Sequence, residues 1–172
     1  MERWLISGKS EHFRAIILLV ITSVLWSSGG LLIKSVDWHP LAISGARSLI
    51  AAAVIRLAFR REPLNFSKAQ ITGAIGYVAT VMLFVSATKL TTAANAIVLQ
   101  YTAPIYVAIF GAWFLKEKTT ATDWLTIGLV FSGMILFFQD QVSAGGMLGN
   151  MLAVASGVSL ALMAMAMRQQ KD

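Results

Sequence analysis

The chain has 172 residues, of which 57% are hydrophobic and only 13% are charged. Soluble domains average about 45–50% apolar and about 25% charged residues, so this composition excludes an intrinsically disordered chain and is atypical of a soluble globular domain. Cysteine is absent and histidine occurs only twice. The sequence therefore predicts no disulfide, no metal site and no cofactor.

Charged residues divide the sequence into apolar stretches that are long enough to cross a bilayer. A helix of about 20 apolar residues spans the hydrocarbon core, and backbone in lipid must satisfy its hydrogen bonds internally, which favours helices. We therefore predict an all-α, polytopic integral membrane helical bundle. Its six transmembrane helices are expected at residues 15–35, 40–59, 69–88, 93–115, 122–139 and 147–167.

A polar and basic arm, residues 1–14, precedes the first predicted span. No A-x-A-like cleavage site follows this span, so we predict a retained helix rather than a signal peptide. Trp26 lies far from either membrane interface, and a buried indole N–H needs an acceptor. Ser27 follows Trp26 and begins the run Ser27, Ser28, Gly29 and Gly30, which would permit close helix approach or local unwinding. Trp26 and Ser27 are the two residues singled out here. Both are candidate substrate-binding residues, and packing within the bundle is the alternative interpretation of Trp26.

The second predicted span contains a basic residue, Arg47. It lies about 10 Å into the membrane from Pro40, at 1.5 Å per residue. A charge at that depth costs several kcal/mol unless it is hydrated or paired. Arg47 either bonds to backbone carbonyls or extends to the interface as a structural residue, or it provides a fixed positive charge at the wall of a substrate cavity. We include it among the candidate site residues.

The fourth predicted span is interrupted near its middle by Pro104. Proline has no amide donor and clashes with the carbonyl four residues earlier, which here belongs to Gln100. We predict a kink with a free carbonyl near the bilayer midplane, where transporters place substrate sites at interrupted helices. Gln100, Tyr101 and Pro104 are therefore candidate substrate-binding residues. A kink that only shapes helix packing is the alternative.

The last two predicted spans carry small residues at helical spacing. Such a face lets two helices approach closely in lipid, so we predict that these residues pack against other helices and form no site. They are Gly128 and Ser132 in the fifth span, and Gly149, Ala153, Gly157 and Ala161 in the sixth.

The distribution of basic residues predicts the orientation in the membrane. Eleven of the 14 Lys and Arg residues lie in the N-terminal arm, the 56–68 and 116–118 loops and the C-terminal tail, against two in the opposite loops. Because cytoplasmic loops are enriched in Lys and Arg, we expect both termini on the cytoplasmic side of the cell membrane, either inner or plasma membrane. This bias also explains the net charge of +6 without a nucleic-acid partner.

These residues together resemble the EamA family of the drug/metabolite transporter superfamily. The similar segments, in order and at the family's spacing, are 25–34, Pro40 with Arg47, 94–117 around Pro104, 127–129 and 132–134. Family members typically have ten helices in two inverted five-helix repeats. The resemblance implies a cytoplasmic arm at 1–14, an EamA-like repeat at 15–139, and a sixth helix with a short cytoplasmic tail at 140–172. This sixth helix would start an incomplete second repeat, so we expect a half-length, truncated chain.

The resemblance implies a permease that exports small metabolites, amino acids or drugs by alternating access. Its substrate-binding residues would be Trp26, Ser27, Arg47, Gln100, Tyr101 and Pro104. A rhomboid-type protease would need a Gly-x-Ser-Gly motif and an intramembrane His, which the sequence lacks, so we predict no enzyme. The alternative is a non-transporting membrane fragment or assembly subunit that needs a partner chain. Expected partners are a small-molecule substrate, the lipid bilayer, and a second copy or a separate second half.

Overall fold

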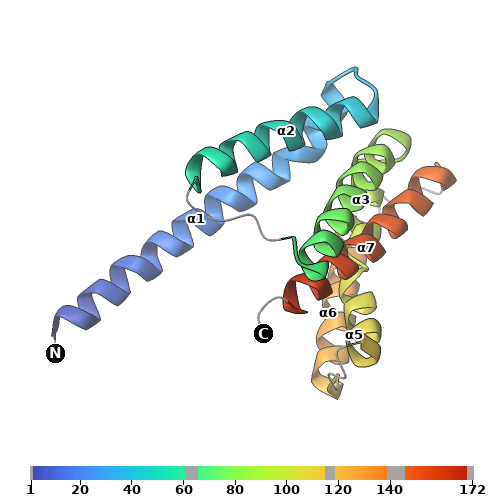
Figure 1. Cartoon of the computed structure of the whole chain (residues 1–172). Coiled ribbons are helices and arrows are strands. Elements are labelled where there is room, and N and C mark those ends of the chain that lie inside the picture. Colours follow the sequence, from blue (N-terminus) through green and yellow to red (C-terminus); the bar gives the residue numbers. More distant parts are fainter. Residues whose placement is uncertain (1, 61–65, 115–118, 139–145, 170–172) are drawn as a thin grey trace. The chain divides into compact units, whose positions relative to one another are not determined.

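The computed structural model describes residues 2–60, 66–114, 119–138 and 146–169. These residues form helices and no strand, which confirms the predicted all-α fold (Figure 1). The helices are α1 Glu2–Ser35, α2 Pro40–Ala58, α3 Lys68–Leu90, α4 Ala93–Gln100, α5 Ala103–Phe114, α6 Ala121–Phe138 and α7 Met147–Arg168.

Five described segments are long and apolar enough to cross a membrane, which supports the predicted integral membrane protein. They are His12–Ser35, Pro40–Ala58, Lys68–Leu90, Ala93–Trp113 and Met147–Arg168. The segment Ala93–Trp113 combines α4 and α5. The fifth predicted span, 122–139, corresponds to α6, Ala121–Phe138.

Short polar side chains begin several of these helices. His39 Nδ1 accepts a hydrogen bond from the Leu41 N–H, and Pro40 starts α2, where a missing amide donor costs nothing. Ser67 caps α3 in the same way. Thr120 and Asp123 exchange hydrogen bonds before α6 in a reciprocal cap, because each side chain accepts from the other's backbone N–H. The helix starts are thus specified locally by the sequence.

The chain divides into two units, Met1–Val36 and Asp37–Asp172, and each is described by itself. In the first unit α1 is one uninterrupted helix, which begins within the predicted polar arm. The Ser28 hydroxyl donates to Leu25 O within this helix. The backbone therefore does not unwind after Ser27.

In the second unit, α3 and α7 lie side by side along much of their length, and α4 and α5 pack against α7 (Figure 1). The fully buried side chains at this junction are small, with Ala87, Ala96 and Ala153 all at 0% exposure. Small side chains allow the helix backbones to approach closely in lipid. Because α7 lies far along the chain from α3, most of this core depends on non-local packing.

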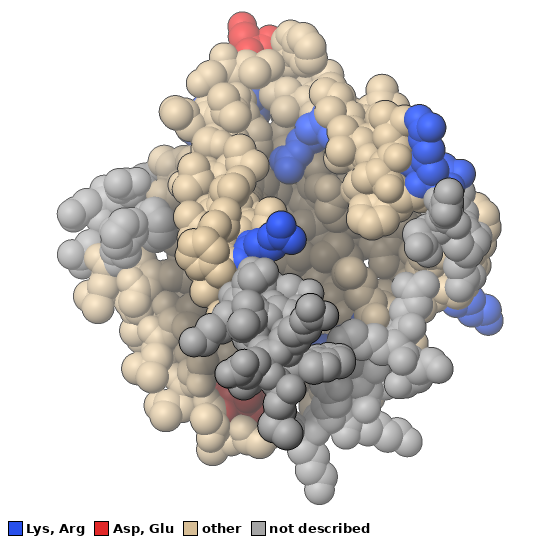
Figure 2. Space-filling view, turned by 90° about the vertical axis from the view of Figure 1, so that its left-hand side faces the viewer, with Lys and Arg blue, Asp and Glu red and all other residues tan. Residues whose placement is uncertain are grey.

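The described surface is dominated by uncharged side chains. Figure 2 shows a face that is mostly tan, with scattered basic groups and little acidic surface. Large apolar side chains are exposed on several helices, including Leu49 at 73%, Trp113 at 81% and Leu129 at 66%. Large apolar side chains exposed on several helices are expected of helices that face lipid.

The predicted packing face of α7 is confirmed. Gly149, Ala153, Gly157 and Ala161 are all buried. A Cβ placed on Gly149 would lie 2.8 Å from the Leu90 carbonyl carbon and from the Thr91 nitrogen. For the fifth span, no atom of the described residues lies within 4 Å of a Cβ placed on Gly128, so packing through this face stays a prediction. This difference arises because α6 makes few contacts with other helices, so its small face remains uncovered among the described residues.

Candidate functional site

The interruption of the fourth predicted span is a break between two helices. α4 ends at Gln100 and α5 begins at Ala103, so that Tyr101 and Thr102 form the α4–α5 break. The Tyr101 N–H still donates to Ile97 O at 2.9 Å. Pro104 occupies the second position of α5, where its missing amide hydrogen is tolerated. The predicted kink is therefore confirmed, and it divides a single apolar span.

Carbonyl groups at the end of α4 lie directly against α7. A Cβ placed on Gly157 would lie only 2.8 Å from Gln100 O and 3.3 Å from Leu99 O. The Thr102 hydroxyl donates to Leu99 O at 2.6 Å and satisfies that carbonyl. The absence of a side chain at Gly157 thus allows the backbone of the break to approach α7.

A chain of polar groups links the break to two other helices inside the apolar bundle. Gln100 Nε2 donates to Ser156 Oγ at 2.8 Å, and the Ser156 hydroxyl donates to Thr80 O at 3.1 Å. Ser156 is 0% exposed and Thr80 is 7% exposed. Since a buried hydrogen bond is costly to leave unmade, these bonds fix the Gln100 side chain relative to α3 and α7.

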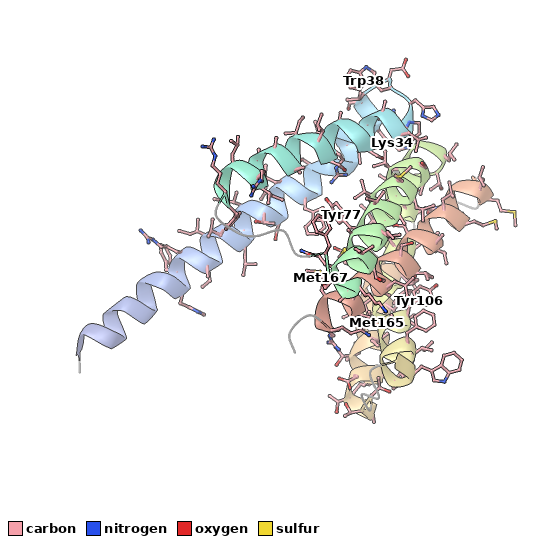
Figure 3. The ribbon with its side chains drawn as sticks, viewed as in Figure 1. Lys34, Trp38, Tyr77, Tyr106, Met165 and Met167 are labelled. Atoms are coloured by element: carbon pink, nitrogen blue, oxygen red, sulfur yellow. The ribbon has the colours of Figure 1, made fainter. Side chains whose placement is uncertain are left out.

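The two tyrosines near the break have different surroundings. Tyr101 caps α4 and is 54% exposed, so its ring is available for a ligand. Tyr106 stacks on Phe110 with 6.4 Å between the ring centroids. In Figure 3, Tyr106 points to one side of the paired α3 and α7, whereas Tyr77 and Met167 lie on the other. Tyr101 is therefore the more accessible tyrosine beside the break.

The structure brings together three of the six predicted site residues. Gln100, Tyr101 and Pro104 surround the break. Arg47 lies in the interior of α2 and is exposed, with no hydrogen bond or ion pair among the described residues. Trp26 and Ser27 lie in α1, within the other unit. The participation of all six residues in substrate binding remains a prediction.

The comparison with known families agrees with this arrangement of interrupted, apolar helices. Residues 13–139 match the EamA-like transporter family. The chain belongs to this family. The sequence-based resemblance is thereby confirmed, and so is the assignment as a helical membrane protein of the drug/metabolite transporter type.

Two curated relatives of this EamA-like chain are solute carriers. It is 28% identical over 146 residues to "Solute carrier family 35 member G1" of Homo sapiens, which covers 80% of this chain and 40% of the relative. It is 29% identical over 134 residues to the protein of the same name in Mus musculus, which covers 73% and 36%. The chain therefore spans about two fifths of the length of these relatives. No solved structure matches it.

Sequence reasoning missed two sets of polar residues in the EamA-like chain. Ser156 and Thr80 hold Gln100, and a second cluster joins Thr91, Asn95 and Asn150. A weak signal exists, since Ser156 and Asn150 each lie next to a glycine of the α7 packing face.

The described residues show no cluster that suits a metal ion. No group of three or more His, Asp or Glu side chains that could hold a metal lies within them. The break instead offers amide, hydroxyl and phenol groups, together with backbone carbonyls. Such groups recognise a ligand by hydrogen bonding and stacking rather than by covalent chemistry.

Ser156→Ala is expected to lower the free energy of unfolding by about 1 kcal/mol, because it leaves the Gln100 amide without its buried acceptor. Thermal or denaturant unfolding in detergent measures this change. Ser159→Ala is the matched control on the same helix, since the Ser159 hydroxyl donates only to Ala155 O of its own helix. Equal destabilisation by the two variants would contradict a special role for the Gln100–Ser156 bond.

Proposed function

We propose that this chain forms part of a transporter that exports small metabolites, amino acids or drugs by alternating access. The observation that carries this proposal is the α4–α5 break, which places the polar side chains of Gln100, Tyr101 and Thr102 within an otherwise apolar span. Membership of the EamA-like transporter family supports a role in transport. The family also favours a transporter over an enzyme.

In the proposed mechanism, the substrate contacts the exposed Tyr101 ring and the Gln100 carboxamide. The Gln100 nitrogen is held by Ser156, which leaves the side-chain oxygen to accept a hydrogen bond from a substrate. Tyr101 and Thr102 connect two short helices, and residues at helix ends absorb the dihedral changes of a hinge. Pivoting at this break would expose the substrate to alternate sides of the membrane. Trp26, Ser27 and Arg47 would complete the cavity wall.

The proposed setting is the cell's inner or plasma membrane, with both termini in the cytoplasm. The excess of Lys and Arg in the terminal segments and in the 56–68 and 116–118 loops supports this orientation. Because the chain spans about two fifths of its curated relatives, we propose that a second half or a second copy completes the cavity. α7 would then be the first helix of a second repeat.

The alternative is a non-transporting membrane subunit that acts by assembling with a partner chain. This chain matches only about two fifths of the length of its solute carrier relatives, which is compatible with a subunit that assembles with another chain. The packing face of α7 does not supply the partner surface, since Gly149 and Gly157 already contact residues of the same chain. A partner would instead use exposed apolar side chains elsewhere.

Transport assays in proteoliposomes distinguish these proposals. The chain is purified from native membranes together with any chain bound to it and is then reconstituted, and uptake of a mixture of radiolabelled amino acids and of the dye ethidium is measured against protein-free vesicles. Saturable uptake that depends on the protein is expected for a transporter. Uptake equal to that of protein-free vesicles, together with recovery of the chain in a larger complex from native membranes, would support the assembly subunit instead.

A further inference from the structure

A groove runs along the junction of α4 and α7, with a volume of about 540 Å³. Its lining residues are Leu99, Met147, Asn150, Met151, Val154 and Ala155. Asn150 is the only polar side chain among them, and none is charged. The groove begins in the first turn of α7 and ends at Leu99, next to the α4–α5 break. We refer to it as the α4/α7 groove.

The orientation of the Asn150 side chain is fixed by two hydrogen bonds to its oxygen. Thr91 Oγ1 donates to Asn150 Oδ1 at 2.9 Å, and Asn95 Nδ2 donates to the same oxygen at 3.1 Å. Asn95 is 1% exposed, so this pair is buried. A carboxamide carries its oxygen and its NH₂ group on opposite sides. With the oxygen held inward, the Asn150 NH₂ group is directed away from Thr91 and Asn95.

The Asn150 NH₂ group has no acceptor among the described residues, because the bonds of this side chain are the two to its oxygen. The Asn150 nitrogen is also not completely buried. Asn150 therefore presents a fixed hydrogen-bond donor at the wall of an apolar groove. A ligand that fits must combine one acceptor oxygen with an apolar body.

The position of Asn150 along the membrane-spanning helix α7 indicates which hydrogen-bond acceptor its NH₂ group meets. It is the fourth residue of α7, a helix that qualifies as a membrane span, so it lies about 5 Å from the helix start at 1.5 Å per residue. This is where the hydrocarbon core meets the interfacial region, and ester carbonyls of glycerolipids join their acyl chains at that boundary. Deeper along α7, Met151 and Val154 offer only apolar contact.

We propose that the α4/α7 groove binds an acyl chain of a bilayer glycerolipid, whose ester carbonyl accepts a hydrogen bond from Asn150 Nδ2. Backbone carbonyls of a neighbouring helix are already engaged in that helix, whereas lipid ester carbonyls are available as acceptors. The uncharged lining disfavours a phosphate or carboxylate ligand. This lipid site is independent of the transport proposal.

The absence of cysteine from the chain allows a direct test. Met151→Cys places a single thiol in the groove, and Leu148→Cys is its matched control, because both residues are on α7 and 62% exposed but only Met151 lines the groove. Labelling by N-ethylmaleimide is followed in vesicles of diester phosphatidylcholine and of diether phosphatidylcholine with the same chain length. The diether lipid lacks the ester carbonyl.

We expect M151C to react about fivefold more slowly in diester than in diether vesicles, which corresponds to about 1 kcal/mol for one hydrogen bond. L148C should react at the same rate in both. Equal rates for M151C in the two lipids would overturn the proposal. Thiol cross-linking of M151C into dimers in both lipids would also overturn it, because a second copy would then cover the groove.

A second variant tests the donor itself. Asn150→Asp at pH 8 keeps an oxygen for Thr91 and Asn95 but replaces the NH₂ donor with an acceptor. In this background M151C should react equally in the two lipids. A difference that persists in N150D would overturn the role of Asn150. The lipid comparison with Asn150 intact remains decisive even where N150D fails to fold.

Discussion

Gly157→Val is expected to lower the free energy of unfolding of the chain by about 3 kcal/mol, at the upper end for overpacking in a core. The new Cβ would lie 2.8 Å from Gln100 O and 3.3 Å from Leu99 O. These neighbours are backbone atoms, which cannot move aside as the end of a flexible side chain can. Relief requires α7 to separate from the α4–α5 break. Thermal unfolding of the purified chain in detergent measures the loss.

Gly128→Val is the matched control for this variant. It introduces the same β-branched side chain into the interior of an apolar helix, so the intrinsic helix-propensity change is the same. No atom lies within 4 Å of its Cβ, and its stability should stay close to that of the unsubstituted chain. Equal losses for the two variants would show that helix propensity, and not contact with the break, controls the effect.

Tyr101→Ala is expected to reduce the initial rate of transport at least tenfold, which corresponds to about 1.4 kcal/mol of transition-state stabilisation. The ring is 54% exposed at the end of α4, so its removal deletes a ligand contact without opening a cavity in the core. The amount of protein in the membrane should stay unchanged. Initial uptake rates in proteoliposomes, normalised to the reconstituted protein, measure the effect.

Trp113→Ala is the control for the loss of an exposed aromatic ring from the same span. Trp113 is 81% exposed at the far end of α5 and away from the break, so its removal should leave the transport rate close to that of the unsubstituted chain. An unchanged rate in Tyr101→Ala would remove Tyr101 from the proposed binding site. Equal losses in both variants would indicate a general requirement for aromatic surface.

The helices were largely predictable because their causes are local. Apolar runs between charged residues correspond to the observed spans, and Pro104 acts on its own helix through the missing amide and the clash with the preceding turn. The fifth span is an example, because α6 runs from Ala121 to Phe138 where the sequence predicts 122–139.

The partners of the polar side chains were not predictable from this one sequence. Gln100 and Ser156 are separated by 56 positions, and Ser156 and Thr80 by 76. A serine in an apolar span has no pattern that identifies its acceptor, since it can also bond within its own helix, as Ser159 does. The small-residue pattern has the same limit. It showed that Gly157 and Gly128 permit close approach, but within the described part of the chain only the Gly157 position has atoms of another helix beside it.

The packing of α7 against α3 and α4 also determines the order in which contacts can form during biosynthesis. Gln100 and Asn95 enter the membrane before their α7 partners have been synthesised. At about 5–20 residues per second, the ribosome needs about 3–11 s to add the 56 residues between Gln100 and Ser156. During that interval the two amides require water, lipid carbonyls or the insertion machinery as temporary partners. The insertion of α7 would therefore be the step that commits α3, α4 and α5 to their final packing.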